Sequence, residues 1–225
     1  MKDNNFSIAI KILNELKLNY WVCHGTLLGI VRDKKLLDWD NDIDIALMED
    51  EVNRDEIIKK FLNNGFKLKK KYFENDGLLT FIKNGSKEID INFYQLSSDE
   101  KKVYTYWFIP KNFVCKLIDV LANAKNYRGK YLKIINKLHF LQSIFMYFKK
   151  FLIKKNIFFL EIGYQHSYDF VSSKSKIMFE NLELSIPKEP EEYLANIYGK
   201  DWMIPNKDFI WYKDSPALAK KNNEK

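Results

Sequence analysis

The amino-acid sequence predicts an α+β fold in which helices flank a small mixed β-sheet, with a C-terminal helical region. Two features of the first 110 residues favour this class: an amphipathic helix at the start, and later segments in which charged and apolar residues alternate as in strands. After residue 110 the pattern becomes helical. We expect a core of residues 1–110 and a mainly helical part of residues 111–225, packed as one compact unit.

The core is predicted to open with a helix at 6–18, because Ala9, Ile12, Leu13 and Leu16 recur at helical spacing. The next expected elements are an apolar strand at 20–23, a turn at 24–26, a short helix at 27–32 and a strand at 42–47. Acidic and apolar residues alternate in the last of these, so this strand should have one polar face and one apolar face.

The rest of the core is predicted as one helix and several strands. The expected elements are a helix at 50–63 with a C-cap at Asn64-Gly65, and strands at 66–73, 78–83, 88–94 and 103–108, the last ended by Pro110. Asn84-Gly85 is a strong signal for a hairpin turn between two of these strands.

Charge and cysteine content indicate partners and compartment. The chain has 37 basic and 30 acidic residues, a net charge of +7, which favours an anionic partner, although basic surface also serves solubility. Cys23 and Cys115 cannot form a disulfide framework and are expected to be buried thiols in a reducing compartment. The start does not resemble a signal peptide, and the apolar run at 138–148 is too short to span a bilayer. We expect a cytoplasmic protein.

A basic helical region is predicted at 131–160. Between Asp119 and Glu161 the chain has nine Lys or Arg residues and no acidic residue. Five apolar residues of this region fall on one helical face: Leu138, Leu141, Phe145, Phe148 and Leu152. Such a helix either lies on an anionic membrane surface, through lysines such as 149, 150, 154 and 155, or packs this stripe against the sheet and leaves its lysines in solvent.

Three aspartates are the predicted metal ligands. Asp42 and Asp44 are two residues apart on a predicted strand, so both carboxylates point to one face, where a cation between them would offset their repulsion. Asp90 lies between two isoleucines on a later predicted strand. If the two strands are neighbours in the sheet, Asp90 would lie beside Asp42 and Asp44. Such an all-oxygen triad suits Mg²⁺ or Mn²⁺.

A glycine turn, His24-Gly25-Thr26, stands at a strand end ahead of a short helix. Backbone N–H groups and a hydroxyl at such a turn can contact a phosphate. Glycine turn, paired acids and a third acid together are the arrangement that phosphoryl transfer requires. Two alternatives stay open: Thr26 as a helix N-cap, and His24 as a structural residue.

These residues resemble the signature of the LicD family, which includes bacterial phosphocholine transferases and resembles fukutin and fukutin-related protein. The matching segments are HGTLLG at His24–Gly29, Arg32, and WDNDIDI at Trp39–Ile45. The tail also agrees, at Ile186-Pro187, Pro190–Leu194, Tyr198–Trp202 and Pro205. The pattern departs at Asn41, where an acid is usual, and at Asp38, where proline is common; neither departure removes a predicted ligand.

The resemblance implies a nucleotidyltransferase-like fold and transfer of a phospho-alcohol from a CDP-activated donor to a hydroxyl of a glycan or lipid-linked glycan, in surface polysaccharide or lipopolysaccharide. The alcohol would be choline-like, glycerol-like or ribitol-like. On this basis Asp42 and Asp44 hold the metal, Asp90 is the third ligand or the base, and Asp40 acts beside them or as the base. Donor phosphate would be bound by His24, Gly25, Thr26 and Arg32, the last alternatively in a surface ion pair.

Two other functions stay open. The chain could be a nucleotidyltransferase that attaches a nucleoside monophosphate to a small molecule or protein, with the same triad. It could also be a non-catalytic module that binds a nucleotide or anionic lipid, although unused paired carboxylates carry an electrostatic cost. A nucleic-acid partner is not expected, because the lysines cluster with bulky apolar residues and no recognition motif accompanies them.

Overall fold

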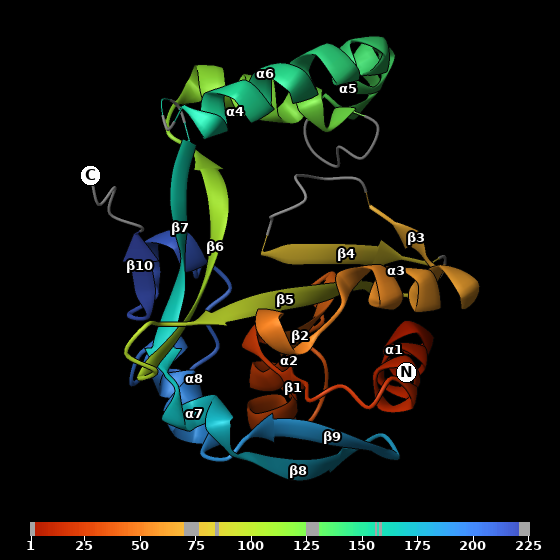
Figure 1. The fold of residues 1–225 in the computed structure, drawn as a ribbon. Coiled ribbons are helices and arrows are strands. Elements are labelled where there is room, and N and C mark those ends of the chain that lie inside the picture. The colour runs from red at the N-terminus through yellow and green to blue at the C-terminus, as the bar shows by residue number, and fades with distance from the viewer. Residues whose placement is uncertain are drawn as a thin grey trace. The chain divides into compact units, whose positions relative to one another are not determined.

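The computed structural model describes residues 3–69, 77–83, 86–124, 131–155, 157 and 159–220 (Figure 1). It divides the chain into two compact units: unit 1 is residues 1–69, 77–105 and 163–219, and unit 2 is residues 70–76, 106–162 and 220–225. The structure thus groups residues 163–219 with the N-terminal part, which differs from the predicted division at residue 110. None of the helices in the described ranges is long and apolar enough to cross a membrane.

Unit 1 is an α+β structure built on a mixed sheet, as predicted. The strands follow the order β1-β2-β5-β6-β7-β10, with β4 pairing with β5 and with β3. Their bounds are β1 (Trp21–Val22), β2 (Asp42–Met48), β3 (Lys67–Leu68), β4 (Leu78–Ile82), β5 (Glu88–Leu96), β6 (Lys102–Pro110), β7 (Phe159–Ser167) and β10 (Leu218–Lys220). β2 and β5 are parallel, and β4 and β5 are antiparallel, as a hairpin requires. The predicted Asn84-Gly85 turn lies outside the described residues.

Helices surround this sheet. They are α1 (Asn4–Glu15), α2 (His24–Leu28), α3 (Arg54–Asn63), α7 (Asp169–Ser172), α8 (Pro190–Tyr198) and α9 (Trp211–Asp214), with a π-helix at Gly29–Asp33 and a 3₁₀ turn at Glu49–Glu51. α1 is capped by the Asp3 side chain and buries Ala9, Ile12 and Leu13, the face that its spacing predicts. α3 begins four residues later than predicted, because the Asn53 side chain caps its start.

The prediction for the C-terminal half needs correction, since strands follow the helices. A second sheet pairs β8 (Lys174–Phe179) with β9 (Leu182–Pro187), and β7 and β10 extend the main sheet. In β7 the buried residues Ile162, Tyr164 and His166 are two apart, the spacing of a strand face. The strand predicted at 66–73 is short, with β3 limited to Lys67–Leu68 and residues 70–73 outside the described part.

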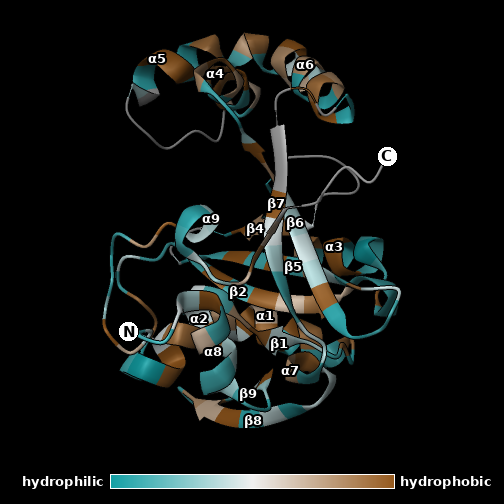
Figure 2. Ribbon diagram, turned by 90° about the vertical axis from the view of Figure 1, so that its left-hand side faces the viewer, coloured by the Kyte–Doolittle hydropathy of each residue, from teal (hydrophilic) through white to brown (hydrophobic). Residues whose placement is uncertain are grey.

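Unit 2 contains α4 (Phe113–Ala122), α5 (Leu132–Lys137), a 3₁₀ turn (Leu138–Leu141) and α6 (Gln142–Lys154). Figure 2 shows hydrophobic and hydrophilic residues interspersed along these helices. Cys115, Leu152 and Ile153 form their buried cluster. The alternative in which the whole predicted stripe packs inward does not hold, because Phe148 is 52% exposed although Leu152 is buried. Lys149 is fully buried and donates a 2.6 Å hydrogen bond to Asp119. The side of α6 that carries Lys149 is therefore the buried side.

Candidate metal centre

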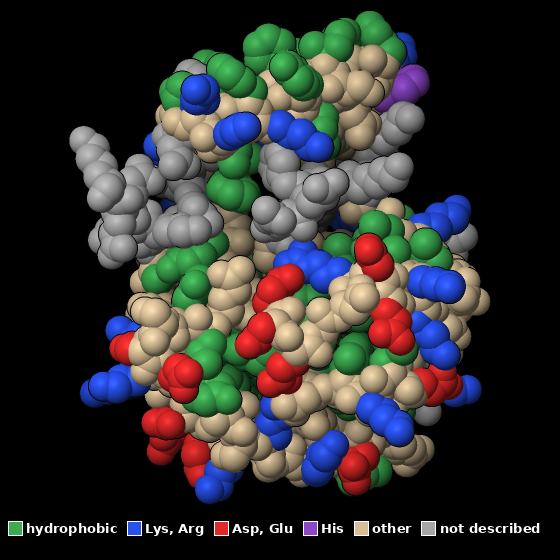
Figure 3. All heavy atoms as spheres, viewed as in Figure 1, with side chains coloured by type: hydrophobic (Ala, Val, Ile, Leu, Met, Phe, Trp, Pro, Cys, Tyr) green, Lys and Arg blue, Asp and Glu red, His purple; other side chains and the backbone are tan. Residues whose placement is uncertain are grey.

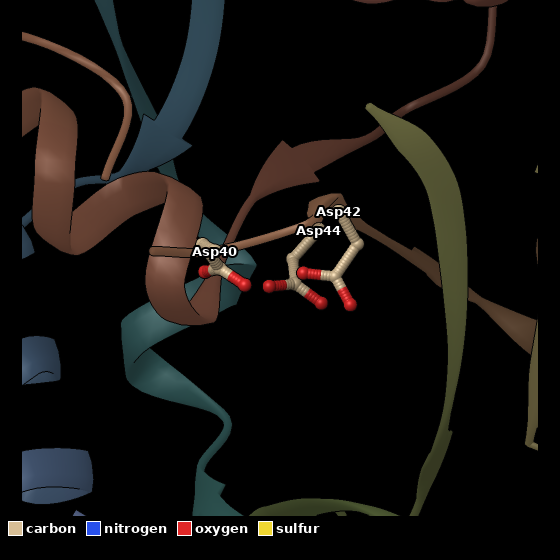
Figure 4. Close-up of side chains that lie close together, drawn as sticks. All are labelled: Asp40, Asp42 and Asp44. Carbon is tan, nitrogen blue, oxygen red and sulfur yellow. The ribbon is translucent and has the colours of Figure 1, made fainter. Parts of the chain in front are cut away.

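Three aspartates at the start of β2 form an acidic cluster. Asp42 and Asp44 lie on one face of the strand, and Asp40 lies in the loop just before it. One carboxylate oxygen from each lies within 4.8 Å of the others. Figure 4 shows the three carboxylates gathered at the end of the strand, beside the helical turn that precedes it. Three partly exposed carboxylates are a donor set that fits a hard divalent cation such as Mg²⁺ or Mn²⁺.

Burial and neighbouring charges raise the pKa values of two members of this cluster, Asp44 and Asp40. Burial first, and then the charges of Asp42, Asp90 and Asp40, raise the pKa of Asp44 well above its usual range, although a hydrogen bond from Asn92 opposes the shift. Burial, together with a hydrogen bond to Asp42 and the charge of Asp42, raises the pKa of Asp40 to about 7. A bound cation would favour the charged forms and offset this repulsion.

Asp90 lies beside this cluster on the parallel neighbour strand β5. The register pairs Asp44 with Asp90 and Asp42 with Glu88, so these side chains belong to the same face of the sheet. Asp90 is 8% exposed, and its charge contributes to the raised pKa of Asp44. Among the described residues, a group of three mutually close carboxylates is formed by Asp40, Asp42 and Asp44. The role of Asp90 as third ligand or base stays a prediction.

Thr26 fixes the position of β2 against α2. Its hydroxyl accepts a 2.8 Å hydrogen bond from the backbone N–H of Asp44, and the Asp44 carbonyl accepts one of 3.2 Å from Cys23. The N-cap position of α2 is Cys23, with no side-chain cap, so the alternative of Thr26 as an N-cap does not hold. Thr26 therefore orients Asp44 through its backbone N–H.

Gly25 is the residue that lets Asp40 reach the cluster. A Cβ atom at position 25 would overlap the Oδ2 atom of Asp40 and lie 3.8 Å from an Asp44 carboxylate oxygen. Such an approach is closer than any side chain at position 25 would permit. Position 25 therefore requires glycine for a steric reason, which is independent of the phosphate contact predicted for this residue.

His24 belongs to a buried network. Its backbone has a φ of 48°, and its Nε2 atom is hydrogen-bonded to the Tyr94 hydroxyl at 3.1 Å. That hydroxyl lies 3.5 Å from Nε2 of His166, whose Nδ1 is 2.8 Å from the Asn196 side-chain oxygen. Burial lowers the pKa of His24 to about 3 and that of His166 to about 4. Both imidazoles are therefore neutral at pH 7. The contacts of His24 are those of a structural residue, which was one of the alternatives that the sequence left open.

This network predicts a loss of stability in acid. In the unfolded chain each histidine binds a proton near pH 6.5, but the folded protein resists this protonation down to about pH 4, so the free energy of unfolding falls as the pH drops through that window. His166→Gln should flatten this dependence by about 1–2 kcal/mol between roughly pH 7 and pH 5 in urea titrations. His139→Gln is the matched control, because His139 is exposed. Parallel profiles for the wild type and His166→Gln would contradict the prediction.

Arg32 connects two segments that are far apart in the sequence. Its Nε and Nη2 atoms donate hydrogen bonds of 2.7 and 2.9 Å to the Asp33 carboxylate, and its Nη1 donates one of 3.3 Å to the Trp202 carbonyl. The Arg32 side chain is 5% exposed, so this is an ion pair but not one at the surface. The predicted phosphate contact of Arg32 stays a prediction.

Removing this contact should destabilise the fold. Arg32→Met leaves the Asp33 carboxylate, which is 22% exposed, without its bidentate partner, so we expect a loss of about 2 kcal/mol in free energy of unfolding. Lys35→Met is the matched control, because it breaks an exposed pair with Asp38 and should cost less than about 1 kcal/mol. Equal losses in the two variants, measured by urea denaturation, would show that the Arg32 contact adds nothing specific.

Two residues of the site are absent from the sequence prediction. Lys87 donates hydrogen bonds to the carbonyls of Leu37 and Asp40, and so holds the loop that carries Asp40. Asn92 donates a 3.4 Å hydrogen bond to Oδ1 of Asp44. Asn92 is two residues after Asp90, so strand alternation indicates its face, whereas the sequence offers no signal for Lys87.

One protein family and several known proteins are similar to parts of this chain. The family described as LicD/FKTN/FKRP, nucleotidyltransferase domain, matches residues 17–142. Human ribitol-5-phosphate transferase FKTN is 24% identical over 211 residues, which cover 94% of this chain and 35% of that protein. An uncharacterized protein of Rickettsia typhi is 36% identical over 70 residues, 31% of this chain and 21% of that protein. The chain thus spans about a third or less of the length of these relatives.

Among solved structures, the lincomycin-bound lincosamide antibiotic adenylyltransferase LnuA is similar with a TM-score of 0.44 and 11% identity, covering 84% of this chain and 82% of that one.

Proposed function

Because the chain belongs to the LicD/FKTN/FKRP family, we propose that it is a metal-dependent phosphotransferase that moves a phospho-alcohol from a CDP-activated donor to a glycan hydroxyl. The observation that carries this proposal is the cluster of Asp40, Asp42 and Asp44, whose carboxylates lie within 4.8 Å of one another. The human relative is a ribitol-5-phosphate transferase, which favours a phospho-alcohol over a nucleoside monophosphate as the transferred group.

In this reaction the acceptor hydroxyl oxygen attacks the phosphorus that bears the alcohol. The bond between that phosphorus and the bridging oxygen breaks, and CMP leaves with the bond's electron pair. A Mg²⁺ or Mn²⁺ ion at the cluster would neutralise charge on the pyrophosphate. Asp42 and Asp44 would hold this ion from β2, while Thr26 and Asn92 keep Asp44 in place.

The acceptor proton needs a base, and two carboxylates are candidates. Partial burial and a hydrogen bond to Asp42 raise the pKa of Asp40 to about 7 in the metal-free protein. Asp90 lies on the same face of the sheet one strand away. Loss of activity in Asp90→Asn with cation affinity retained would assign the base to Asp90, and the same result in Asp40→Asn would assign it to Asp40.

The proposal also includes acceptor and compartment. The acceptor would be a surface polysaccharide or lipopolysaccharide glycan, free or lipid-linked, and the reaction would take place in the cytoplasm. Cys23 and Cys115 are both buried and free, which accords with a reducing compartment.

A donor screen tests the proposal. The purified protein is incubated with Mg²⁺ or Mn²⁺ and with CDP-choline, CDP-glycerol, CDP-ribitol or the common nucleoside triphosphates, while release of CMP or pyrophosphate is followed. We expect CMP release from one CDP-alcohol, and none with the Asp42→Ala/Asp44→Ala variant. Pyrophosphate release from a triphosphate would replace the proposal with nucleotidyl transfer, as in the family's domain description. Inactivity without cation binding would favour a non-catalytic module.

A further inference from the structure

The helix α6 of unit 2 carries an apolar stripe that faces solvent. The stripe consists of Ile144, Tyr147, Phe148 and Phe151, whose exposed fractions are 55%, 72%, 52% and 48%. Their spacing of three, four and seven residues places them on one side of the helix. Large side chains at this exposure are costly in water, so a row of four along one helix indicates a surface that contacts something else.

The opposite side of α6 makes the packing contacts. Leu152 and Ile153 are buried in the cluster with Cys115, and Lys149 is buried in its ion pair with Asp119. The stripe is therefore not the core-facing side of the helix. α4 adds further exposed apolar residues at Phe113, Val114 and Leu117.

The charge around the apolar stripe has one sign. Lys150, Lys154 and Lys155 are exposed on or just after α6, and Lys116 is exposed on α4. From residue 111 to 157 the chain has one acidic residue, Asp119, which already pairs with Lys149. Figure 3 shows hydrophobic side chains gathered over the helices of unit 2, with lysine side chains beside them.

We propose that this part of unit 2 docks on an anionic lipid surface, with the apolar stripe at the level of the acyl chains and the lysines at the phosphates. Apolar side chains flanked by lysines are the composition of an interfacial helix, in which the lysine stems lie along the apolar surface and the ammonium groups reach the headgroups. A second copy of the chain would set two positive surfaces against each other. The assignment goes beyond the catalytic proposal and does not depend on it.

Vesicle co-sedimentation of the full chain tests the docking. The probes are phosphatidylcholine vesicles and vesicles that also contain phosphatidylglycerol. We expect binding to the anionic vesicles that weakens with salt, and roughly fivefold weaker partitioning for each lysine lost in Lys154→Gln/Lys155→Gln. The triple variant Ile144→Ser/Tyr147→Ser/Phe148→Ser should lose at least roughly tenfold. Circular dichroism checks the folding of each variant, and the lysine pair keeps the test valid if the triple variant does not fold.

Matched controls alter exposed residues of the same kinds in unit 1. They are Leu62→Ser/Met178→Ser, at positions 46% and 67% exposed, and Lys11→Gln/Lys59→Gln. Full binding by these controls supports the assignment. Absence of binding by the wild type, or equal losses in controls and stripe variants, would overturn it. A dimer of the wild type that dissociates in the triple variant, without vesicle binding by either, would assign the surface to a second copy instead.

Discussion

Asp44→Asn is expected to remove divalent-cation binding and transferase activity together, while making the metal-free protein more stable. Asp44 has neighbours Asp40, Asp42 and Asp90, all of which raise its pKa, and burial raises it most. A neutral side chain of the same shape removes one ligand charge, so the affinity for Mg²⁺ or Mn²⁺ should fall more than roughly a hundredfold. The same change removes a negative charge that is penalised by burial first and by repulsion second, which should add about 1–3 kcal/mol to the free energy of unfolding in EDTA near pH 8.

The sign of the stability change is what makes this test specific. A carboxylate whose pKa is raised in the folded state destabilises that state once the pH rises above the pKa of the unfolded chain, so its replacement by a neutral amide should stabilise the metal-free protein. Calorimetry measures the cation affinity and urea titration the stability. Asp38→Asn is the matched control, because Asp38 is exposed and pairs with Lys35, outside the acidic cluster. Retained cation binding in Asp44→Asn, or destabilisation without metal, would remove Asp44 from the centre of the site.

Gly25→Ala is expected to inactivate the protein through Asp40. The added methyl group would overlap the Oδ2 atom of Asp40, so the carboxylate must leave its place or the helix must shift. Displacement of a catalytic group by about 1 Å costs on the order of a hundredfold in rate, and overpacking costs about 1–3 kcal/mol in stability. The measurements are CMP release with the identified donor and urea denaturation.

A double-mutant cycle separates this steric cause from a general defect. In the Asp40→Gly background the overlapping atom is absent, and position 25 lies in α2, where alanine is the better helix former. Gly25→Ala should therefore be neutral or stabilising in that background, giving a coupling of about 1–3 kcal/mol. Equal destabilisation in both backgrounds would show that position 25 has another requirement for glycine, such as a contact made by its backbone.

The strands that carry the acids were predictable, because their information is local. Asp42 and Asp44 alternate with Ile43 and Ile45, and this period-two pattern fixes both the strand and the side to which the carboxylates point. The place of Asp40 in the cluster was not predictable in the same way. It depends on a loop held by Lys87, which is 47 residues away in sequence and carries no motif.

The buried side of the helices in unit 2 was not predictable from the local sequence. Apolar residues occur on nearly every side of α6, so periodicity alone cannot select the side that is buried. The buried side includes Lys149, which pairs with Asp119 across 30 residues, and the apolar contacts of Leu152 and Ile153 with Cys115. In the same way, the strand β7 depends on partners that are distant in sequence, since it lies between β6 and β10.

The hydrogen bond from Arg32 to Trp202 has a consequence for synthesis on the ribosome. The two residues are 170 positions apart, so Arg32 and the acidic cluster after it leave the exit tunnel long before this hydrogen bond can form. Contacts of such separation form late and slow folding. The strand that carries Asp42 and Asp44 therefore stays without this contact in the nascent chain until residue 202 has left the tunnel.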